Sequence, residues 1–252
     1  MEEYALKFVD ETNIDQEHIC CAIGNDKTNR QRAQVKKEWL LSQFSHGHKF
    51  LKVDVRGKVF IEYSPAEHAW FPLTGPGYTF IQCFWASGRY KGKGHGKRLL
   101  AACGEDSKTT NGLAAFATKK KMPYTVDRKF LIKQGFEVAD EIEGGFLLLV
   151  KKFNPGAPVP RFTESASKDK IENSPGLVLY YSDMCPFNEP FIKKMADVGK
   201  ERGLKAEIRK VRSAREAQSL PISFGNCLVF QDARTTSRMS FLDKKFNELL
   251  DK

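Results

Sequence analysis

The feature that most limits the fold of this chain is a three-part stretch within residues 78–109. It starts with an aromatic-rich run, YTFIQCFWAS (78–87), passes through a loop with glycine at every second position, KGKGHG (91–96), and ends in an amphipathic segment. The run predicts a β-strand and the segment an α-helix. The first amides of a helix lack intrahelical partners, and glycine lets a ligand approach the backbone closely. The stretch therefore predicts a binding loop for a phosphorylated ligand.

Two common glycine-rich nucleotide motifs fit this loop less well. A dinucleotide-binding fingerprint needs GxGxxG and an acidic residue about 20 positions later, at the end of a second strand. Here the spacing is GxGxG, and the next strand, GLAAFAT (112–118), has no acidic end. No GK[ST] follows, which excludes a P-loop. A solvated basic turn would not need glycines at regular spacing.

The segments around the loop alternate between helical and extended patterns, which predicts an α/β fold with a mixed central sheet. The hairpin around Arg56-Gly57 alternates apolar and polar residues, and the helix near residue 130 ends at Gly135. The predicted elements are a helix at 35–44, the hairpin KFLKVDV and KVFIEYS, the strand at 78–87, a helix to about residue 109, a strand at 112–118, a helix in 126–138 followed by a strand, and a strand at 144–152.

A proline-rich connector divides the chain. Its composition predicts an irregular linker at 153–174 between a domain at 1–152 and a smaller one at 175–252. The net charge of +10 is spread over both parts, with 24 Lys/Arg against 18 Asp/Glu in 1–152 and 17 against 13 in 153–252. A spread excess, with a single tight run at 119–121, does not favour a nucleic-acid partner.

Composition also bears on location. No apolar run approaches the roughly 20 residues that cross a bilayer, and the N-terminus lacks a signal-peptide pattern. The six cysteines form no CxxC pair, which argues against a structural zinc or a disulfide framework. His46 and His48 look like a loop pair, and two ligands do not make a metal site. We expect a cytoplasmic protein with no metal and no membrane partner.

The glycine loop resembles the pyrophosphate-binding motif [Q/R]xxGx[G/A] of the Gcn5-related N-acetyltransferases (GNAT). Two registers fit, Arg89–Gly94 and Lys91–Gly96, and the second places Leu99 where the family usually has a leucine. Lys91 then replaces the usual Arg or Gln. FLIKQGF (130–136) is similar to the family's FYEKLGF, and the element order over 1–152 matches. The resemblance implies transfer of an acetyl group from acetyl-CoA to a small-molecule amine in a ternary complex.

The same resemblance implies where the co-substrate binds. The strand at 82–87 would separate from its neighbour and pair with the pantetheine arm, while amides of the glycine loop would hold the pyrophosphate. Cys83 could approach the thioester, although a buried cysteine is more often part of a core. The implied cofactor residues are Cys83, Phe84, Trp85, Ala86, Lys91, Gly92, Lys93, Gly94, His95, Gly96 and Lys97.

The catalytic residues do not follow the family's pattern, because Leu131 aligns with the tyrosine that usually serves as the general acid. Tyr124, which aligns with a frequent asparagine of the family, is the substitute candidate for the general acid, or else a packing residue. Glu62 is the candidate base, or else a solvent-facing strand residue. Loss of the tyrosine leaves open an alternative function, a CoA-binding sensor without catalysis.

The second domain resembles a small thioredoxin or glutaredoxin fold. A buried strand is followed by CPFN (185–188) at a predicted helix start, and the order of elements is βαβαββα with a closing helix at 241–250. Asn188 replaces the second cysteine of CxxC. A helix start favours a reactive thiolate at Cys185, yet without a resolving cysteine other than Cys227 a binding or structural module is favoured over a monothiol redox module. The whole arrangement resembles bacterial acetyltransferases that carry a YoaP-like C-terminal domain.

Overall fold

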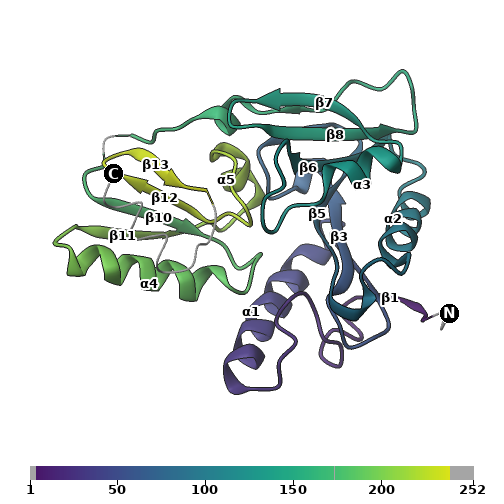
Figure 1. Ribbon diagram of the computed structural model, residues 1–252, viewed down its shortest axis with the longest axis horizontal. Coiled ribbons are helices and arrows are strands. Elements are labelled where there is room, and N and C mark those ends of the chain that lie inside the picture. The colour runs from purple at the N-terminus through teal and green to yellow at the C-terminus, as the bar shows by residue number, and fades with distance from the viewer. Residues whose placement is uncertain (1–3, 173, 239–252) are drawn as a thin grey trace. The chain divides into compact units, whose positions relative to one another are not determined.

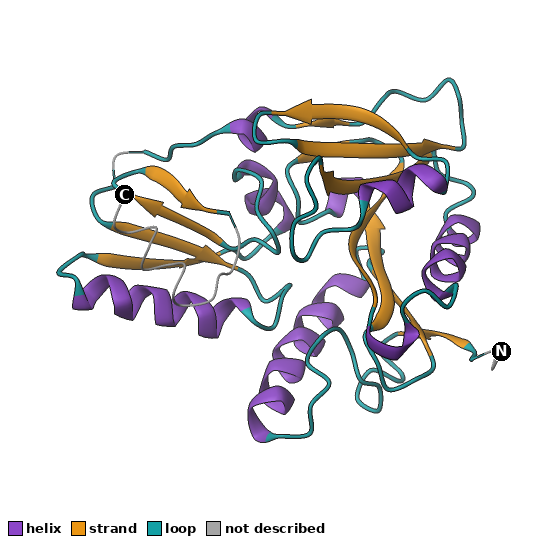
Figure 2. Ribbon diagram, viewed as in Figure 1, coloured by secondary structure: helices purple, strands orange, loops and turns teal. Residues whose placement is uncertain are grey.

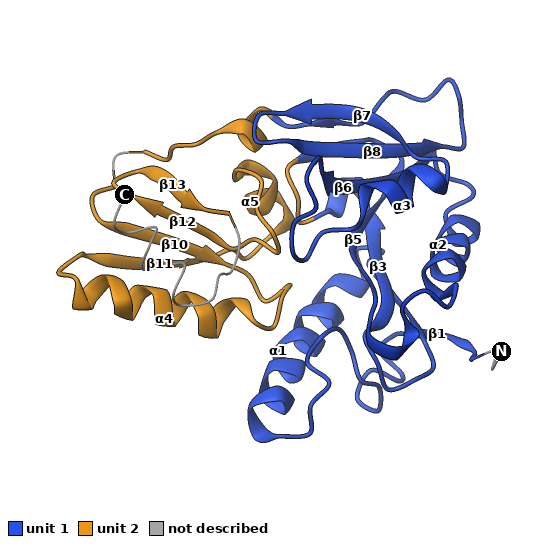
Figure 3. Ribbon diagram, viewed as in Figure 1, with its two compact units in different colours: residues 1–69, 73–163 blue, residues 70–72, 164–252 orange. Residues whose placement is uncertain are grey.

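The structure is a computed structural model that describes residues 4–172 and 174–238. The chain divides into two compact units, residues 1–69 with 73–163 and residues 70–72 with 164–252 (Figure 3). The boundary at 163/164 lies inside the predicted linker, which contains a short strand, β9 (Arg161–Phe162), and a 3-10 helix, η3 (Glu164–Ser167). Within the described residues, no helix has both the length and the apolar character needed to cross a membrane.

Unit 1 is built on a seven-stranded mixed sheet with the order β1-β2-β3-β5-β6-β8-β7. β5 and β6 are parallel, and the other neighbouring strands are antiparallel. The predicted α/β fold with a mixed sheet is therefore confirmed. The strands are β1 (Leu6–Val9), β2 (Lys49–Val53), β3 (Val59–Pro65), β5 (Tyr78–Ala86), β6 (Gly112–Thr118), β7 (Glu137–Ile142) and β8 (Phe146–Lys152). A separate pair joins β4 (Leu73–Thr74) to β9.

Helices cover both faces of this sheet (Figures 1 and 2). α2 (His95–Asp106) and α3 (Arg128–Lys133) pack on one face, where Leu99, Cys103 and Leu131 join the main core of the unit. α1 (Lys27–Phe44) lies on the other side. The helix α3 ends at Lys133, and Gly135 (φ +85°) is the predicted C′ glycine, because the amides of Gly135 and Phe136 bond back to the last turn.

Three expectations about unit 1 need correction. The strand β1 was not predicted. The helix α1 begins at Lys27 rather than residue 35, with Asp26 capping its first turn by accepting from the Asn29 amide. The hairpin strands β2 and β3 do not have one solvated face, because residues 59–64 are all buried. Helix α1 on one side and α2 on the other explain this burial.

Unit 2 contains a four-stranded sheet with the order β11-β10-β12-β13, in which only β10 and β11 are parallel. Helix α4 packs on it through Ile192, Met195 and Ala196. The predicted helix at 241–250 lies outside the described residues. The elements are β10 (Leu177–Tyr181), α4 (Asn188–Glu201), β11 (Ala206–Lys210), α5 (Ala214–Ser219), β12 (Leu228–Gln231) and β13 (Arg234–Ser237).

Candidate active site

The sheet of unit 1 divides between β5 and β6. The parallel ladder joins residues 78–81 to residues 112–115. Beyond it, β5 continues along β3 to Ala86, and β6 continues along β8 to Thr118. A β-bulge sits at the point of separation, because Tyr63 pairs with Ile81 whereas Glu62 pairs with Cys83, so that Gln82 is the extra residue. In the segment predicted to hold the pantetheine arm, 82–87, residues 82–86 are the part of β5 beyond the ladder.

The glycine loop leads from the end of β5 into α2. Gly92 (φ +76°) and Gly94 (φ +83°) adopt the left-handed conformation that favours glycine, and Gly94 is the N-cap of α2. A Cβ atom added at either residue would meet nothing within 4 Å, so the space next to the backbone is open. Gly96 differs, since its Cβ would lie 3.6 Å from the Phe130 ring. The buried Leu99 packs into the core beneath the helix.

Positive charge surrounds this loop. Lys91, Lys93 and Lys97 are exposed, and within the described part of the chain they make no ion pair or hydrogen bond. Arg98 instead donates to the backbone carbonyl of Tyr4, and Arg89 Nη2 donates to Tyr90 Oη at 2.7 Å. The three lysines are therefore the cations that are available for an anionic ligand.

The loop is supported by the turn between β2 and β3. Ser87 N donates to Lys58 O at 3.1 Å. A Cβ at Gly57 would lie 2.6 Å from the Tyr90 ring, so the turn packs directly under the residue that precedes the loop. The ring of Tyr90 in turn contacts the imidazole of His95, the first residue of α2, with centroids 5.9 Å apart. This support was not predicted from the sequence.

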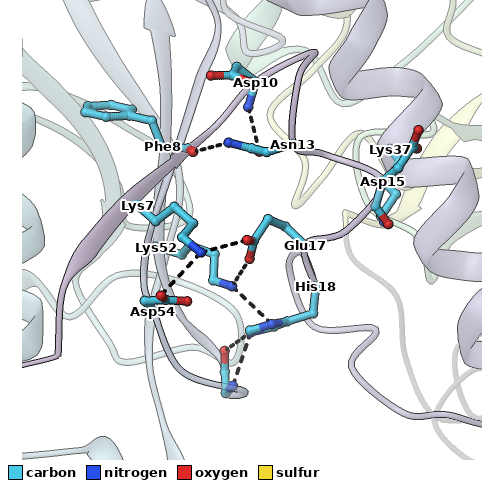
Figure 4. A network of polar contacts seen from close by, with 11 residues as sticks. Lys7, Phe8, Asp10, Asn13, Asp15, Glu17, His18, Lys37, Lys52 and Asp54 are labelled. Carbon is cyan, nitrogen blue, oxygen red and sulfur yellow. Dashed lines mark hydrogen bonds and ion pairs between the residues drawn. The ribbon is translucent and has the colours of Figure 1, made fainter.

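A polar network holds that turn in place (Figure 4). His18 Nδ1 accepts from the Lys52 ammonium at 3.1 Å, so Nε2 of a neutral ring carries the hydrogen and donates to the Gly57 carbonyl at 3.3 Å. The buried Lys52 also binds Glu17 Oε2 at 2.6 Å. Burial, followed by the charge of Lys52, lowers the pKa of His18. A neutral His18 therefore fits between the ammonium and the turn.

Glu62 lies in a buried charged cluster. Its Oε1 accepts from Lys36 Nζ at 2.6 Å and contacts His48 Nε2 at 2.9 Å, and all three side chains are almost fully buried. The Lys36 ammonium also stands 4.0 Å above the Trp39 ring. The interpretation of Glu62 as a solvent-facing residue is therefore wrong. The position also lies close to the separation of the strands, because its partner in β5 is Cys83.

The charges of this cluster affect one another. Burial opposes ionisation of the Glu62 carboxyl, yet Lys36 and His48 outweigh it and hold the pKa of Glu62 below its usual value. Burial lowers the pKa of His48, and the contact with Glu62 opposes this only in part. The cluster is therefore a Lys36–Glu62 ion pair next to an imidazole whose pKa is lowered, which favours its neutral form.

The candidate for the general acid lies across the division of the sheet. Tyr124, in the loop between β6 and α3, is 64% exposed with φ +65°, and its ring centroid is 6.3 Å from that of Trp85 in β5. Its high exposure argues against the alternative of a packed tyrosine. Leu131 is fully buried in the core. The remaining predicted residues of β5, Cys83 to Ala86, are partly buried along the same strand.

The sequence did not reveal Lys36 or the true place of His48. His46 and His48 both lie in the loop between α1 and β2, as predicted, but His48 is buried beside Glu62, whereas the exposed His46 stacks on His68 with centroids 5.2 Å apart. A signal existed, because Glu62 interrupts the apolar strand VFIEYS and a buried carboxylate needs a cation. Lys36 lies on the same helical face as Trp39 and Leu40. No cluster of three or more metal-ligating side chains occurs within the described residues.

In unit 2 the region of Cys185 is closed by its own hydrogen bonds. Cys185 lies in a turn before α4, which begins at Asn188. The buried Asn188 side chain donates to the carbonyls of Gly225 and Ser182, and a Cβ at Gly225 would lie 3.2 Å from that of Cys185. Burial, with a smaller contribution from Cys185, raises the pKa of the Cys227 thiol.

Comparison with known proteins decides the family. No protein-family model matches the chain. It is 36% identical over 241 residues to the uncharacterized N-acetyltransferase YoaP of Bacillus subtilis, a match that covers 95% of each protein. The chain belongs to the GNAT family of N-acetyltransferases. The prediction of a GNAT enzyme is thus confirmed, and the match extends through both units.

Solved GNAT structures are also similar to this chain. The PaiA N-acetyltransferase of Thermoplasma acidophilum in complex with coenzyme A is 17% identical with a TM-score of 0.41, over 59% of this chain and 99% of that one. YhbS of Escherichia coli in complex with CoA is 12% identical with a TM-score of 0.42, over 64% and 90%. The thioredoxin resemblance of unit 2 stays a prediction.

Proposed function

We propose that this GNAT chain transfers an acetyl group from acetyl-CoA to an amine by direct attack in a ternary complex. The observation that carries the proposal is the separation of β5 from β6 directly before an open glycine loop. An extended pantetheine arm pairs with a strand edge of this kind. The amides at the start of α2, and three lysines that have no partner in the part of the chain that the structure describes, favour the pyrophosphate.

In this proposal the arm lies along residues 82–87, and the amides of residues 92–97 hold the pyrophosphate. Gly92 and Gly94 are left-handed and open, so a phosphate can come close to the backbone. The acceptor reaches the thioester near Cys83, where the ladder between β5 and β6 has ended. Binding both reactants in one site supplies much of the rate.

Two proton transfers complete the reaction. The acceptor nitrogen attacks the thioester carbonyl carbon and loses a proton, while the C–S bond breaks and the departing thiolate gains a proton. Glu62 is our candidate for the general base, because it pairs across the strands with Cys83, next to the proposed position of the thioester. Tyr124 is our candidate for the acid, because it is exposed and faces Trp85 of β5.

The cofactor part is tested by thermal shift. Acetyl-CoA should raise the melting temperature of the full chain, whereas NAD and ATP should not. At a ligand concentration a hundredfold above the dissociation constant, the gain is about 2.7 kcal/mol. The catalytic part is tested by measuring thiol release from acetyl-CoA with a panel of amines and amino acids. No shift with millimolar acetyl-CoA contradicts the proposal.

A second candidate function is a CoA-binding sensor without catalysis. The observation that favours it is that Leu131, a fully buried residue, stands where the family usually has the tyrosine that serves as the general acid. This alternative predicts the same thermal shift with acetyl-CoA but no thiol release with any amine of the panel.

For unit 2 we propose a thioredoxin-like domain that serves as a binding or structural module. The order β11-β10-β12-β13, with a helix after β10, supports this assignment. Asn188, in the place of a second cysteine, uses its side chain to bind backbone carbonyls rather than to do chemistry. A monothiol redox module is the alternative. The six free cysteines are consistent with the proposed cytoplasmic location.

A further inference from the structure

The imidazole of His48 has one ring nitrogen in use and one without a partner. Nε2 lies 2.9 Å from Glu62 Oε1, whereas Nδ1 is buried without a hydrogen bond within the described residues. The side chain of His48 is only 2% exposed. A buried polar atom without a partner calls for a physical cause, since it costs about 1–3 kcal/mol when nothing binds it.

The contact with Glu62 decides which nitrogen carries the hydrogen. Lys36 keeps Glu62 ionised, and a carboxylate can only accept hydrogen bonds. His48 Nε2 must therefore carry the hydrogen, which leaves a free lone pair on Nδ1. The Glu62 charge raises and the Lys36 charge lowers the pKa of His48, and burial dominates both in keeping the ring neutral. The geometry is that of a base held in one tautomer by a carboxylate.

The strand register places this lone pair near the expected reaction. Lys49 pairs with Tyr63, and a Cβ at Gly47 would lie 3.1 Å from Pro65, so His48 stands opposite Ser64. It thus shares a face of the sheet with Glu62 and, across β3, with Cys83. A pantetheine arm that runs along β5 from Ala86 reaches Cys83 after three residues, which is about 10 Å at 3.3 Å per residue.

Two further buried atoms gather on the same face. Ser64 Oγ and Tyr78 Oη also lack hydrogen-bond partners within the described residues. Ser64 pairs with Phe80, two residues from Tyr78, so both hydroxyl groups belong to the face that carries His48. Tyr78 lies farther along β5 from Cys83, whereas Ser64 is two residues from Glu62, so Ser64 Oγ and His48 Nδ1 are the two unpartnered polar atoms that the register brings nearest to the charged cluster. Such buried atoms call for a polar ligand.

We infer that His48 Nδ1 takes the proton from the acceptor amine, with Glu62 and Lys36 as positioning residues. The inference rests on the proposed function and changes the role of Glu62 from base to the group that orients the base. The neutral amine forms a C–N bond with the acetyl carbon, its proton passes to Nδ1, and the C–S bond breaks. The thiolate takes its proton from the general acid, for which Tyr124 is the candidate, and no oxidant or reductant is needed.

The test compares His48→Gln with His46→Gln in the full chain. Glutamine can keep a donor toward Glu62 but has no basic nitrogen, and His46 is an exposed control two residues away. Two substrates are used: acetyl-CoA with water as the nucleophile, which needs no identified acceptor, and acetyl-CoA with the best amine of the panel. We expect His48→Gln to lower kcat by about 10² to 10³, within the usual range for a general base. The KM for acetyl-CoA should change less than twofold, and His46→Gln should match the wild type.

A second measurement does not depend on turnover. Nitrogen-15 NMR of the histidine rings should show His48 as the Nε2–H tautomer, and Glu62→Gln should disturb this form and move the acid limb of the pH–rate profile. A wild-type-like kcat for His48→Gln, or an Nδ1–H tautomer, overturns the inference while leaving the proposed function intact. A wild-type chain that binds no acetyl-CoA and releases no thiol overturns both.

Discussion

The loop before helix α2 in unit 1 is open, whereas the turn before helix α4 in unit 2 is filled by its own side chains. In unit 1 the loop before α2 has two left-handed glycines with open space beside them and lysines without partners within the described residues. In unit 2 the turn before α4 is filled, because Gly225 packs against Cys185 and Asn188 binds the surrounding carbonyls. A helix start is thus not a site by itself. A binding site also needs accessible backbone amides and charged side chains that make no contacts within the protein.

The largest difference that we expect between the units is their response to acid. All five histidines lie in unit 1. Burial lowers the folded-state pKa of His48 and His18 below the unfolded value of about 6.5, so unfolding takes up protons as the pH falls through that value. Each proton adds a slope of about 1.4 kcal/mol per pH unit.

Unit 1 should therefore lose stability between pH 7.5 and pH 5.5, whereas unit 2 should not. Hydrogen exchange followed by mass spectrometry reports each unit separately in the full chain. Equal loss of protection in both units over this range would contradict the prediction.

The next effect concerns the open glycines. Gly94→Val should weaken acetyl-CoA binding about a hundredfold or more, because its side chain takes the space of the phosphate. The left-handed backbone adds a strain of about 1–2 kcal/mol to folding. Gly203 (φ +77°) after α4 is a matched control, since it too has open space beside it.

Gly203→Val should cost similar stability but leave acetyl-CoA affinity unchanged. Calorimetric titration and urea unfolding of both variants separate the two costs. If Gly94→Val loses stability alone, with affinity per folded molecule retained, the glycine serves only the turn.

A smaller effect tests the closed turn of unit 2. Asn188→Ala removes the amide group that donates to the carbonyls of Ser182 and Gly225, which should lower the stability of this unit by about 1–3 kcal/mol. Alkylation of Cys185 by iodoacetamide should become faster as the turn loosens. Glu189→Ala, which removes a neighbouring surface ion pair with Lys193, should change stability by less than about 1 kcal/mol.

The smallest effect should follow from Cys185→Ser. If the turn is structural, the variant should keep the stability of unit 2 within about 0.5 kcal/mol and leave acetyl transfer unchanged within experimental error. Labelling of wild-type Cys185 should be no faster than that of a cysteine in an unstructured peptide. Rapid labelling with a midpoint near pH 6, typical of an activated thiolate, would instead support the redox alternative.

Local patterns were enough to predict much of the fold. The strand, glycine loop and helix in 78–109 were visible because each has its own periodicity and turn residues. The polar first half of α1, KTNRQRAQ, was missed because it shows no apolar stripe. The buried second face of β2 and β3 was missed because its polar residues Lys52 and Glu62 form ion pairs with Glu17 and Lys36, which lie outside the hairpin, rather than contacts with water.

The site was predicted less completely, for a different reason. Glycine spacing is a local property, whereas the contact of Lys36 and His48 with Glu62 joins residues 26 and 14 positions apart. Whether a glutamate in a strand is solvated or buried depends on what packs over it, here helix α1. The register of the glycine motif, Lys91–Gly96, could be chosen from the sequence because it depends on Leu99, three residues after Gly96. A leucine on the buried face of a helix is also a local pattern.

The short ladder between β5 and β6 also bears on how the domain holds together. It joins two antiparallel sheets, β1-β2-β3-β5 and β6-β8-β7, through four residue pairs. The ladders on either side of it, β3–β5 and β6–β8, have seven residue pairs each, so the chain leaves this seam between the two halves short. A ligand arm lying between the separated ends would act as an eighth strand and close the seam. Substrate binding would then do more than fill a site, since it would extend the short join between the two halves of the sheet.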